Sequence, residues 1–130
     1  MARILVVDDD EQIAKFAQAV LVRSGHEVKT ATRPERAMQL CRIEAFDLVL
    51  SDINMPGNLD GHDLARWVAG SFPKCRVALM STSAEDCKMC PFLAGCPLLR
   101  KPFNGNRMVA FISSALKSQP KIDWDKTSGL

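Results

Sequence analysis

The chain has 130 residues, of which 47% are hydrophobic and 25% are charged, values that are ordinary for a single soluble globular domain. Its formal net charge of +2 gives no reason to expect a nucleic acid or an anionic membrane as a partner. No apolar run reaches the length of a membrane span, and the first residues lack the long apolar stretch of a signal peptide, so we expect a cytoplasmic protein.

Short apolar runs alternate with helical patterns in the first part of the chain. Residues 4–7 are consecutive aliphatic residues, which is typical of a strand buried on both faces. The apolar residues of 13–21 have helical spacing, and Gly25 follows where this helix is expected to end. Residues 27–31 predict a more polar strand at a sheet edge, and Pro34 suits the first turn of a second helix.

The alternation continues through the rest of the chain. Residues 47–52 predict a third strand, which precedes a loop rich in Pro, Gly and Asn and a helical pattern around Trp67. Residues 77–80 predict a fourth strand, and residues 98–99 belong to a short fifth strand before a last helix around Phe111. Strands that alternate with helices indicate a parallel sheet with helices on both faces.

Polar residues stand where the predicted strands end. Asp8 and Asp9 follow the first strand, Asp52 ends the third, Ser81 ends the fourth, and Lys101 ends the fifth. The carboxyl ends of parallel strands meet at one edge of a sheet, so these side chains should share one pocket. Three carboxylates so close repel one another unless a cation or protons intervene, and Mg²⁺ prefers such oxygen ligands.

This arrangement resembles the response regulator receiver domain over residues 2 to about 117. The matching stretches are residues 4–10, 47–57, 60–61 and 101–103. The resemblance implies a flavodoxin-like α/β fold, a doubly wound five-stranded parallel sheet in the order 2-1-3-4-5. We expect a receiver domain at residues 1–117 and, from its polar composition, a flexible C-terminal tail at residues 118–130.

The resemblance also implies a phosphorylation site. Asp8 and Asp9 would position Mg²⁺, together with Asp52 and the backbone carbonyl of Asn54. Asp52 would accept a phosphoryl group from a histidine kinase or a histidine phosphotransfer protein, as an aspartate nucleophile can do. The chain would then act as a signalling switch for an unidentified downstream protein. Its only enzyme-like properties would be Mg²⁺-dependent self-phosphorylation from a donor and slow dephosphorylation.

The remaining site residues would contact the phosphoryl group or flank it. Ser81 would move toward the phosphoryl group, and Lys101 would offer it a positive charge. Pro102 follows the lysine, and the resemblance implies a cis peptide bond between them. Thr82 flanks the site where the family usually has a smaller residue, so its side chain could narrow access to Asp52.

Two further departures from the family concern the expected readout of phosphorylation. Leu98 stands where many receivers carry an aromatic residue whose rotation is coupled to phosphorylation. Pro91 interrupts residues 83–97, the segment expected to hold the fourth helix, and proline removes a backbone donor and clashes with the preceding turn. We therefore expect an atypical fourth helix, and a face for partners that differs from the common one.

The same segment carries three of the five cysteines, Cys87, Cys90 and Cys96. The first two have the spacing of zinc ligands, and this spacing can also lower a thiol pKa in redox sites. The simpler interpretation is that they are reduced cysteines that behave as small hydrophobic residues. Trp124 lies in the polar tail, and whether it contacts the domain or a partner stays open.

Two other functions remain possible from the residues alone. One is a pseudo-receiver that binds partners without phosphorylation, an alternative that Thr82 and Leu98 favour. The other is an aspartate-nucleophile phosphohydrolase of the haloacid dehalogenase type. Such enzymes place the nucleophile after the first strand in an Asp-x-Asp pattern followed by Thr or Val, whereas here Glu11 follows residues 8–10.

Overall fold

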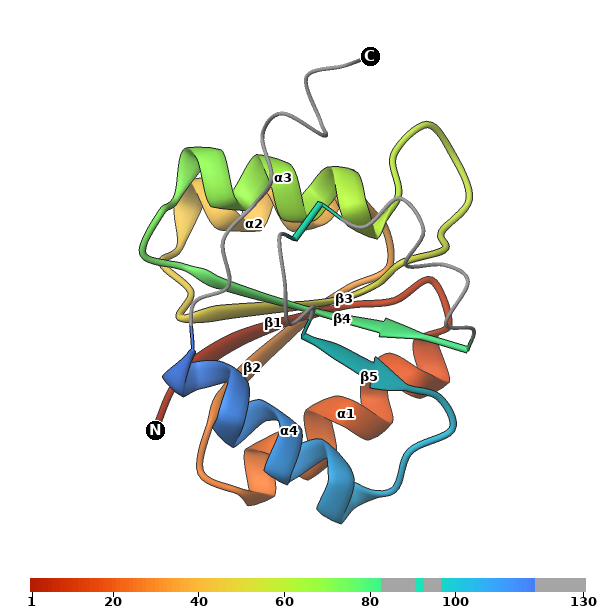
Figure 1. Ribbon diagram of the computed structural model, residues 1–130, viewed down its shortest axis with the longest axis vertical. Helices are drawn as coiled ribbons and strands as arrows, with labels where there is room; N and C mark the ends of the chain where they lie inside the picture. Colours follow the sequence, from red (N-terminus) through yellow and green to blue (C-terminus); the bar gives the residue numbers. More distant parts are fainter. Residues whose placement is uncertain (83–90, 93–96, 119–130) are drawn as a thin grey trace.

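The computed structural model describes residues 1–82, 91–92 and 97–118, which form one sheet flanked by helices (Figure 1). The strands are β1 (Arg3–Val7), β2 (Glu27–Ala31), β3 (Leu48–Asp52), β4 (Arg76–Ser81) and β5 (Leu98–Arg100). The helices of the described residues are α1 (Glu11–Arg23), α2 (Pro34–Ile43), α3 (Gly61–Ser71) and α4 (Gly105–Lys117).

All five strands are parallel, and their order across the sheet is β2-β1-β3-β4-β5. This confirms the predicted fold and strand order. Helices α2 and α3 cover one face of the sheet, and α1 and α4 cover the other (Figure 1). Strand β2 lies at an edge and keeps alternate residues exposed, which matches the prediction of a more polar edge strand.

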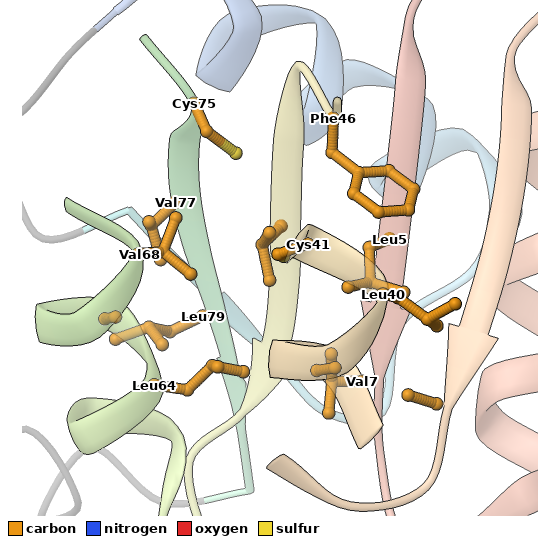
Figure 2. Close-up of a cluster of buried hydrophobic side chains, with 14 of the residues drawn as sticks. Leu5, Val7, Leu40, Cys41, Phe46, Leu64, Val68, Cys75, Val77 and Leu79 are labelled. Carbon is orange, nitrogen blue, oxygen red and sulfur yellow. The ribbon is translucent and has the colours of Figure 1, made fainter. Parts of the chain in front are cut away.

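The central strands are aliphatic because both of their faces are buried. Leu5 and Val7 of β1 pack in the cluster under α2 and α3, part of which Figure 2 shows, whereas Ile4 and Val6 pack under α1 and α4. All four side chains are fully buried. Burying a side chain of this kind contributes about 1.5–3 kcal/mol to the free energy of folding. Strand β1 is therefore stabilised by apolar contacts on both of its faces.

Helix α1 begins with a side-chain cap. The Oδ1 atom of Asp10 accepts hydrogen bonds from the backbone N–H groups of Gln12, at 2.9 Å, and Ile13, at 3.4 Å. These N–H groups have no partner within the helix, so an aspartate here stabilises the first turn.

Replacing Asp10 with alanine should therefore lower the free energy of unfolding by about 1 kcal/mol. Serine can still accept the capping bond, so Asp10→Ser should keep most of the stability. Urea denaturation of both variants checks this prediction. Equal losses for alanine and serine would show that the cap does not stabilise this helix.

Several predicted features fall outside the described residues. Residues 83–90 and 93–96 contain Cys87, Cys90 and Cys96, and most of the segment between β4 and β5 in which an atypical helix was expected. Residues 119–130 contain most of the expected tail. Both expectations therefore stay predictions. Phe92, which is described, is buried and packs in the cluster under α2 and α3. No helix of the described part of the chain is long and apolar enough to cross a membrane.

Candidate functional site

Three carboxylates meet where β1 and β3 end. One side-chain oxygen from each of Asp8, Asp9 and Asp52 can be chosen so that all three lie within 4.8 Å of one another. Asp8 is fully buried and Asp52 is only 8% exposed, whereas Asp9 is exposed to solvent. The predicted convergence of these three residues is thus found in the structure.

Lys101 joins two of these carboxylates. Its Nζ atom donates to Oδ2 of Asp8 at 2.7 Å and to Oδ1 of Asp52 at 3.2 Å. Lys101 follows β5, and its backbone N–H donates to the carbonyl of Ser81 at 2.8 Å, so the edge of the sheet sets the position of the lysine. The peptide bond between Lys101 and Pro102 is cis, as predicted.

The charges of the site compete with one another. Burial raises the pKa of Asp52 from its ordinary 3.8 to about 6, and the charge of Asp8 adds to this rise, while Lys101 opposes it. Burial tends to lower the pKa of Lys101, but its hydrogen bonds and charge contacts with Asp8 and Asp52 outweigh burial, so the pKa is raised. A single lysine therefore leaves the carboxylates only partly neutralised, and a further cation would be favoured.

The loop after β1 holds Asp8 through the backbone. The backbone N–H of Asp8 donates to the carbonyl of Ala31 at 3.1 Å, which continues the pairing of β1 with β2. Its side-chain Oδ1 accepts from the N–H of Asp10 at 2.9 Å, which leaves Oδ2 directed to Lys101. The acidic run after β1 thus combines a helix cap at Asp10 with a buried carboxylate at Asp8.

The backbone of Asp52 lies against the start of α3. A methyl group on Gly61 would stand 2.2 Å from the carbonyl oxygen of Asp52 and 2.7 Å from Cα of Ile53. Real side chains do not approach so closely, so only glycine fits here. The N–H of Gly61 donates to the carbonyl of Ile53 at 2.8 Å. Sequence reasoning noted Gly61 within a motif but assigned it no role.

The other predicted site residues surround this group less directly. Ser81 is buried at the end of β4, and Thr82 is exposed beside it. Thr82 lines a shallow cavity of about 400 Å³ together with Lys101 and Pro102, next to α1. Asn54 is exposed two residues after Asp52. Its carbonyl as a metal ligand stays a prediction.

The model of a protein family described as "Response regulator receiver domain" matches residues 4–113, which are most of the chain. The chain belongs to the response regulator receiver family. This receiver domain carries its buried carboxylates at the strand ends expected from the resemblance. Family members are in general signalling domains of two-component systems and not true enzymes, so the phosphohydrolase alternative is set aside.

Individual relatives agree with this assignment. The receiver domain is 38% identical to the response regulator FleR of Pseudomonas aeruginosa over 80 residues, which cover 62% of this chain and 17% of FleR. Among solved structures, chemotaxis regulator CheY4 of Vibrio cholerae has a TM-score of 0.79 at 26% identity, covering 88% of this chain and 98% of CheY4. The BeF3-activated DrrB receiver domain has a TM-score of 0.77 at 29% identity, covering 91% and 99% of the two chains.

The curated relatives are longer than the region they share with this chain. The match spans 17% of FleR, 50% of the cell cycle regulator CtrA of Caulobacter vibrioides and 49% of YrkP of Bacillus subtilis. The activities of those whole proteins therefore do not transfer with the receiver domain. The match to the solved structures, by contrast, covers nearly the whole of CheY4 and of the DrrB receiver domain.

Proposed function

We propose that this receiver domain is a phosphorylation switch in which Asp52 accepts a phosphoryl group with the help of Mg²⁺. The observation that carries this proposal is the grouping of Asp8, Asp9 and Asp52 within 4.8 Å, with the ammonium of Lys101 between two of them. Phosphoryl transfer depends mainly on positioning and on neutralising charge, and this set of residues supports both.

The donor set fits a magnesium ion. All three side chains offer oxygen atoms, which Mg²⁺ prefers, and they come from two neighbouring strand ends. The exposed position of Asp9 leaves one side of the group open to water, and Mg²⁺ keeps several water ligands. When bound, the ion would offset the charge of Asp8, which adds to the burial that raises the pKa of Asp52, and it would neutralise charge on the transferred phosphoryl group. Asn54 would add its backbone carbonyl.

Asp52 itself would carry the chemistry. A carboxylate oxygen of Asp52 attacks the phosphorus atom, a new oxygen–phosphorus bond forms, and the bond to the donor breaks with its electron pair left on the donor. Lys101 can then contact a phosphoryl oxygen, as it already contacts Asp52. Ser81, buried at the adjacent strand end, can offer its hydroxyl to a second oxygen. Water later hydrolyses the aspartyl phosphate slowly.

The donor would be a histidine kinase or a histidine phosphotransfer protein, as the family relationship supports. The DrrB receiver, similar over nearly its whole length, is described as activated by BeF3. A phosphoryl group at Asp52 would change the balance between two arrangements of the adjoining loops, and an unidentified downstream protein would bind one of them. The unit that does this would be residues 1–117, with 118–130 as a tail.

Incubation with acetyl phosphate and Mg²⁺ tests this proposal. We expect the intact mass of the wild type to rise by one phosphoryl group, and the rise to disappear when EDTA removes Mg²⁺. Asp52→Asn should gain nothing, whereas Asp47→Asn, at the opposite end of β3, should be phosphorylated like the wild type. A folded wild type that gains no phosphate would instead favour the pseudo-receiver alternative.

A further inference from the structure

A second cavity lies at the end of the sheet opposite the phosphorylation site. Its volume is about 390 Å³, within the range of pockets that hold small ligands or side chains. Its lining includes Cys41 of α2, Phe46 before β3, and Phe72 and Cys75 before β4. In Figure 2, Cys75 and Phe46 lie at one end of the apolar cluster, on either side of Cys41.

The lining offers mainly apolar contacts. Burial raises the pKa of the Cys41 thiol to about 11 and that of Cys75 to about 12, so both are uncharged at neutral pH. Glu44, which also lines the cavity, already pairs with Arg3 and Lys29. An occupant would therefore need an apolar or aromatic group at its centre.

One cation lines the same cavity. Lys74 is exposed and forms no ion pair with any residue of the described ranges. A negative group next to the apolar part of an occupant would therefore complement the cavity.

The chain leaves α4 next to this cavity. The side-chain Nε of Arg76 donates to the carbonyl of Ser118 at 3.0 Å. Arg76 follows Cys75 directly, so the exit point lies one residue along β4 from the cavity lining. Trp124 comes six residues after Ser118, and six extended residues span at most about 20 Å. The chain after α4 is thus long enough to bring Trp124 to the cavity.

The sequence of the tail matches what the cavity offers. In residues 119–130, Ile122, Trp124 and Leu130 are the large apolar residues of an otherwise mostly polar stretch, and only Trp124 is flanked by acidic residues on both sides, Asp123 and Asp125. A tryptophan buries about 150–250 Å² and dominates contacts of this kind. Either neighbouring aspartate would place a negative charge near Lys74.

We infer that Trp124 of the tail docks in this cavity of its own chain, with its indole against Phe46, Phe72 and the two thiols. Docking would tie the tail to the end of the sheet away from Asp52 and would cover Cys41 and Cys75. The inference uses no residue of the phosphorylation site, so it stands or falls separately from the proposed function.

Tryptophan fluorescence of the full chain tests this inference. The chain has two tryptophans, so Trp67→Phe leaves Trp124 as the only emitter. We expect blue-shifted emission and quenching by acrylamide that is several-fold weaker than in the denatured chain. Ala45→Glu, which puts a charge on an exposed residue of the cavity lining, should shift the emission to the red. Ala19→Glu, an exposed position on α1 on the other face of the sheet, should leave the emission unchanged.

Emission typical of water-exposed indole, or equal spectra for the two glutamate variants, would overturn the inference. So would a blue shift that depends on protein concentration, since a second copy would then supply the tail. Phosphorylation of Asp52 should be unchanged in Ala45→Glu, because Ala45 lies far from the site at the other end of β3. Unchanged phosphorylation would show that Ala45→Glu is still folded, so that a red shift in its emission reports the loss of the contact with Trp124.

A second measurement does not depend on replacing Trp67, whose ring packs edge-on against Phe72 at 5.5 Å. Alkylation of Cys75 by N-ethylmaleimide can be followed by peptide mass spectrometry in the wild type and in Trp124→Ser. We expect Cys75 to react several-fold faster in the variant, because the docked indole no longer covers it. Equal rates in the two proteins would contradict docking.

Discussion

Gly61→Ala should lower the free energy of unfolding by about 3 kcal/mol, at the upper end of the usual cost of overpacking. The added methyl would stand 2.2 Å from the carbonyl oxygen of Asp52, and it could be accommodated only by a shift of backbone. The start of α3 or the end of β3 would have to move. The variant should therefore lose stability and also phosphorylate more slowly at Asp52.

Gly105→Ala is a matched control for this substitution. Gly105 is also the first residue of a helix that follows a side-chain cap, here Asn104, but the nearest atom to its added methyl would be 3.5 Å away. We expect the free energy of unfolding to change by no more than about 1 kcal/mol, because at this site alanine acts only by lowering the conformational entropy of the unfolded chain. Urea denaturation compares the two variants. Equal effects would contradict a special role of Gly61.

Asp52→Asn should stabilise the metal-free fold at pH 8 by about 3 kcal/mol, although it abolishes the proposed phosphorylation. The pKa of Asp52 is raised to about 6 in the folded chain, so the fold disfavours the ionised carboxylate. From about pH 4 to pH 6 the folded chain holds the proton more tightly, so the contribution of Asp52 to stability falls as the pH rises through this window. Asparagine avoids that loss.

Denaturation in EDTA across the pH range measures this difference. The two proteins should be equally stable near pH 3.5, and the gap should open by pH 6 and stay constant above it. Mg²⁺ at pH 8 should narrow this difference in stability, because it should bind the three carboxylates of the wild type more tightly than the two that remain in Asp52→Asn. Glu35→Gln, which removes an exposed charge, should change stability by less than about 0.5 kcal/mol. A variant less stable than the wild type in EDTA would contradict the proposed electrostatics.

The sequence was sufficient to predict where the site lies. A buried strand and its carboxyl end are identified by the aliphatic residues 4–7 and the acidic residues that follow them. Asp52 likewise marks the carboxyl end of the aliphatic run that forms β3. Parallel topology brings such strand ends together, so the sequence alone predicted that Asp8, Asp52 and Lys101 lie in one pocket, as they do. The order of the strands came from the family resemblance and is confirmed.

The contacts that hold the site could not be predicted in the same way. The clash that makes Gly61 necessary depends on how closely α3 approaches Asp52, and hydrophobic periodicity does not encode that distance. Lys101 bonds Asp8 at 2.7 Å, a contact across 93 residues that depends on how the strand ends are aligned. His62, the second residue of α3, is only 3% exposed, and its position in the helical pattern gave no signal of this burial.

We expect the route by which phosphorylation would be read out to differ from the common one at Leu98. This residue pairs with Leu79 across β4 and β5 and packs against the apolar cluster under α2 and α3. An aliphatic side chain there cannot present a phenol, so the usual aromatic rotation has no equivalent at this position. We expect the signal to leave the site through the loops that carry Ser81 and Lys101.

The central claim is that Asp52 is the residue that carries the phosphoryl group. Borohydride reduces an acyl phosphate to an alcohol, so treatment of the phosphorylated chain marks the modified residue for peptide mass spectrometry. The account predicts that the reduced residue is Asp52, and only when Mg²⁺ was present during phosphorylation. Modification at Asp8, Asp9 or any other residue, with Asp52 unchanged, would contradict it.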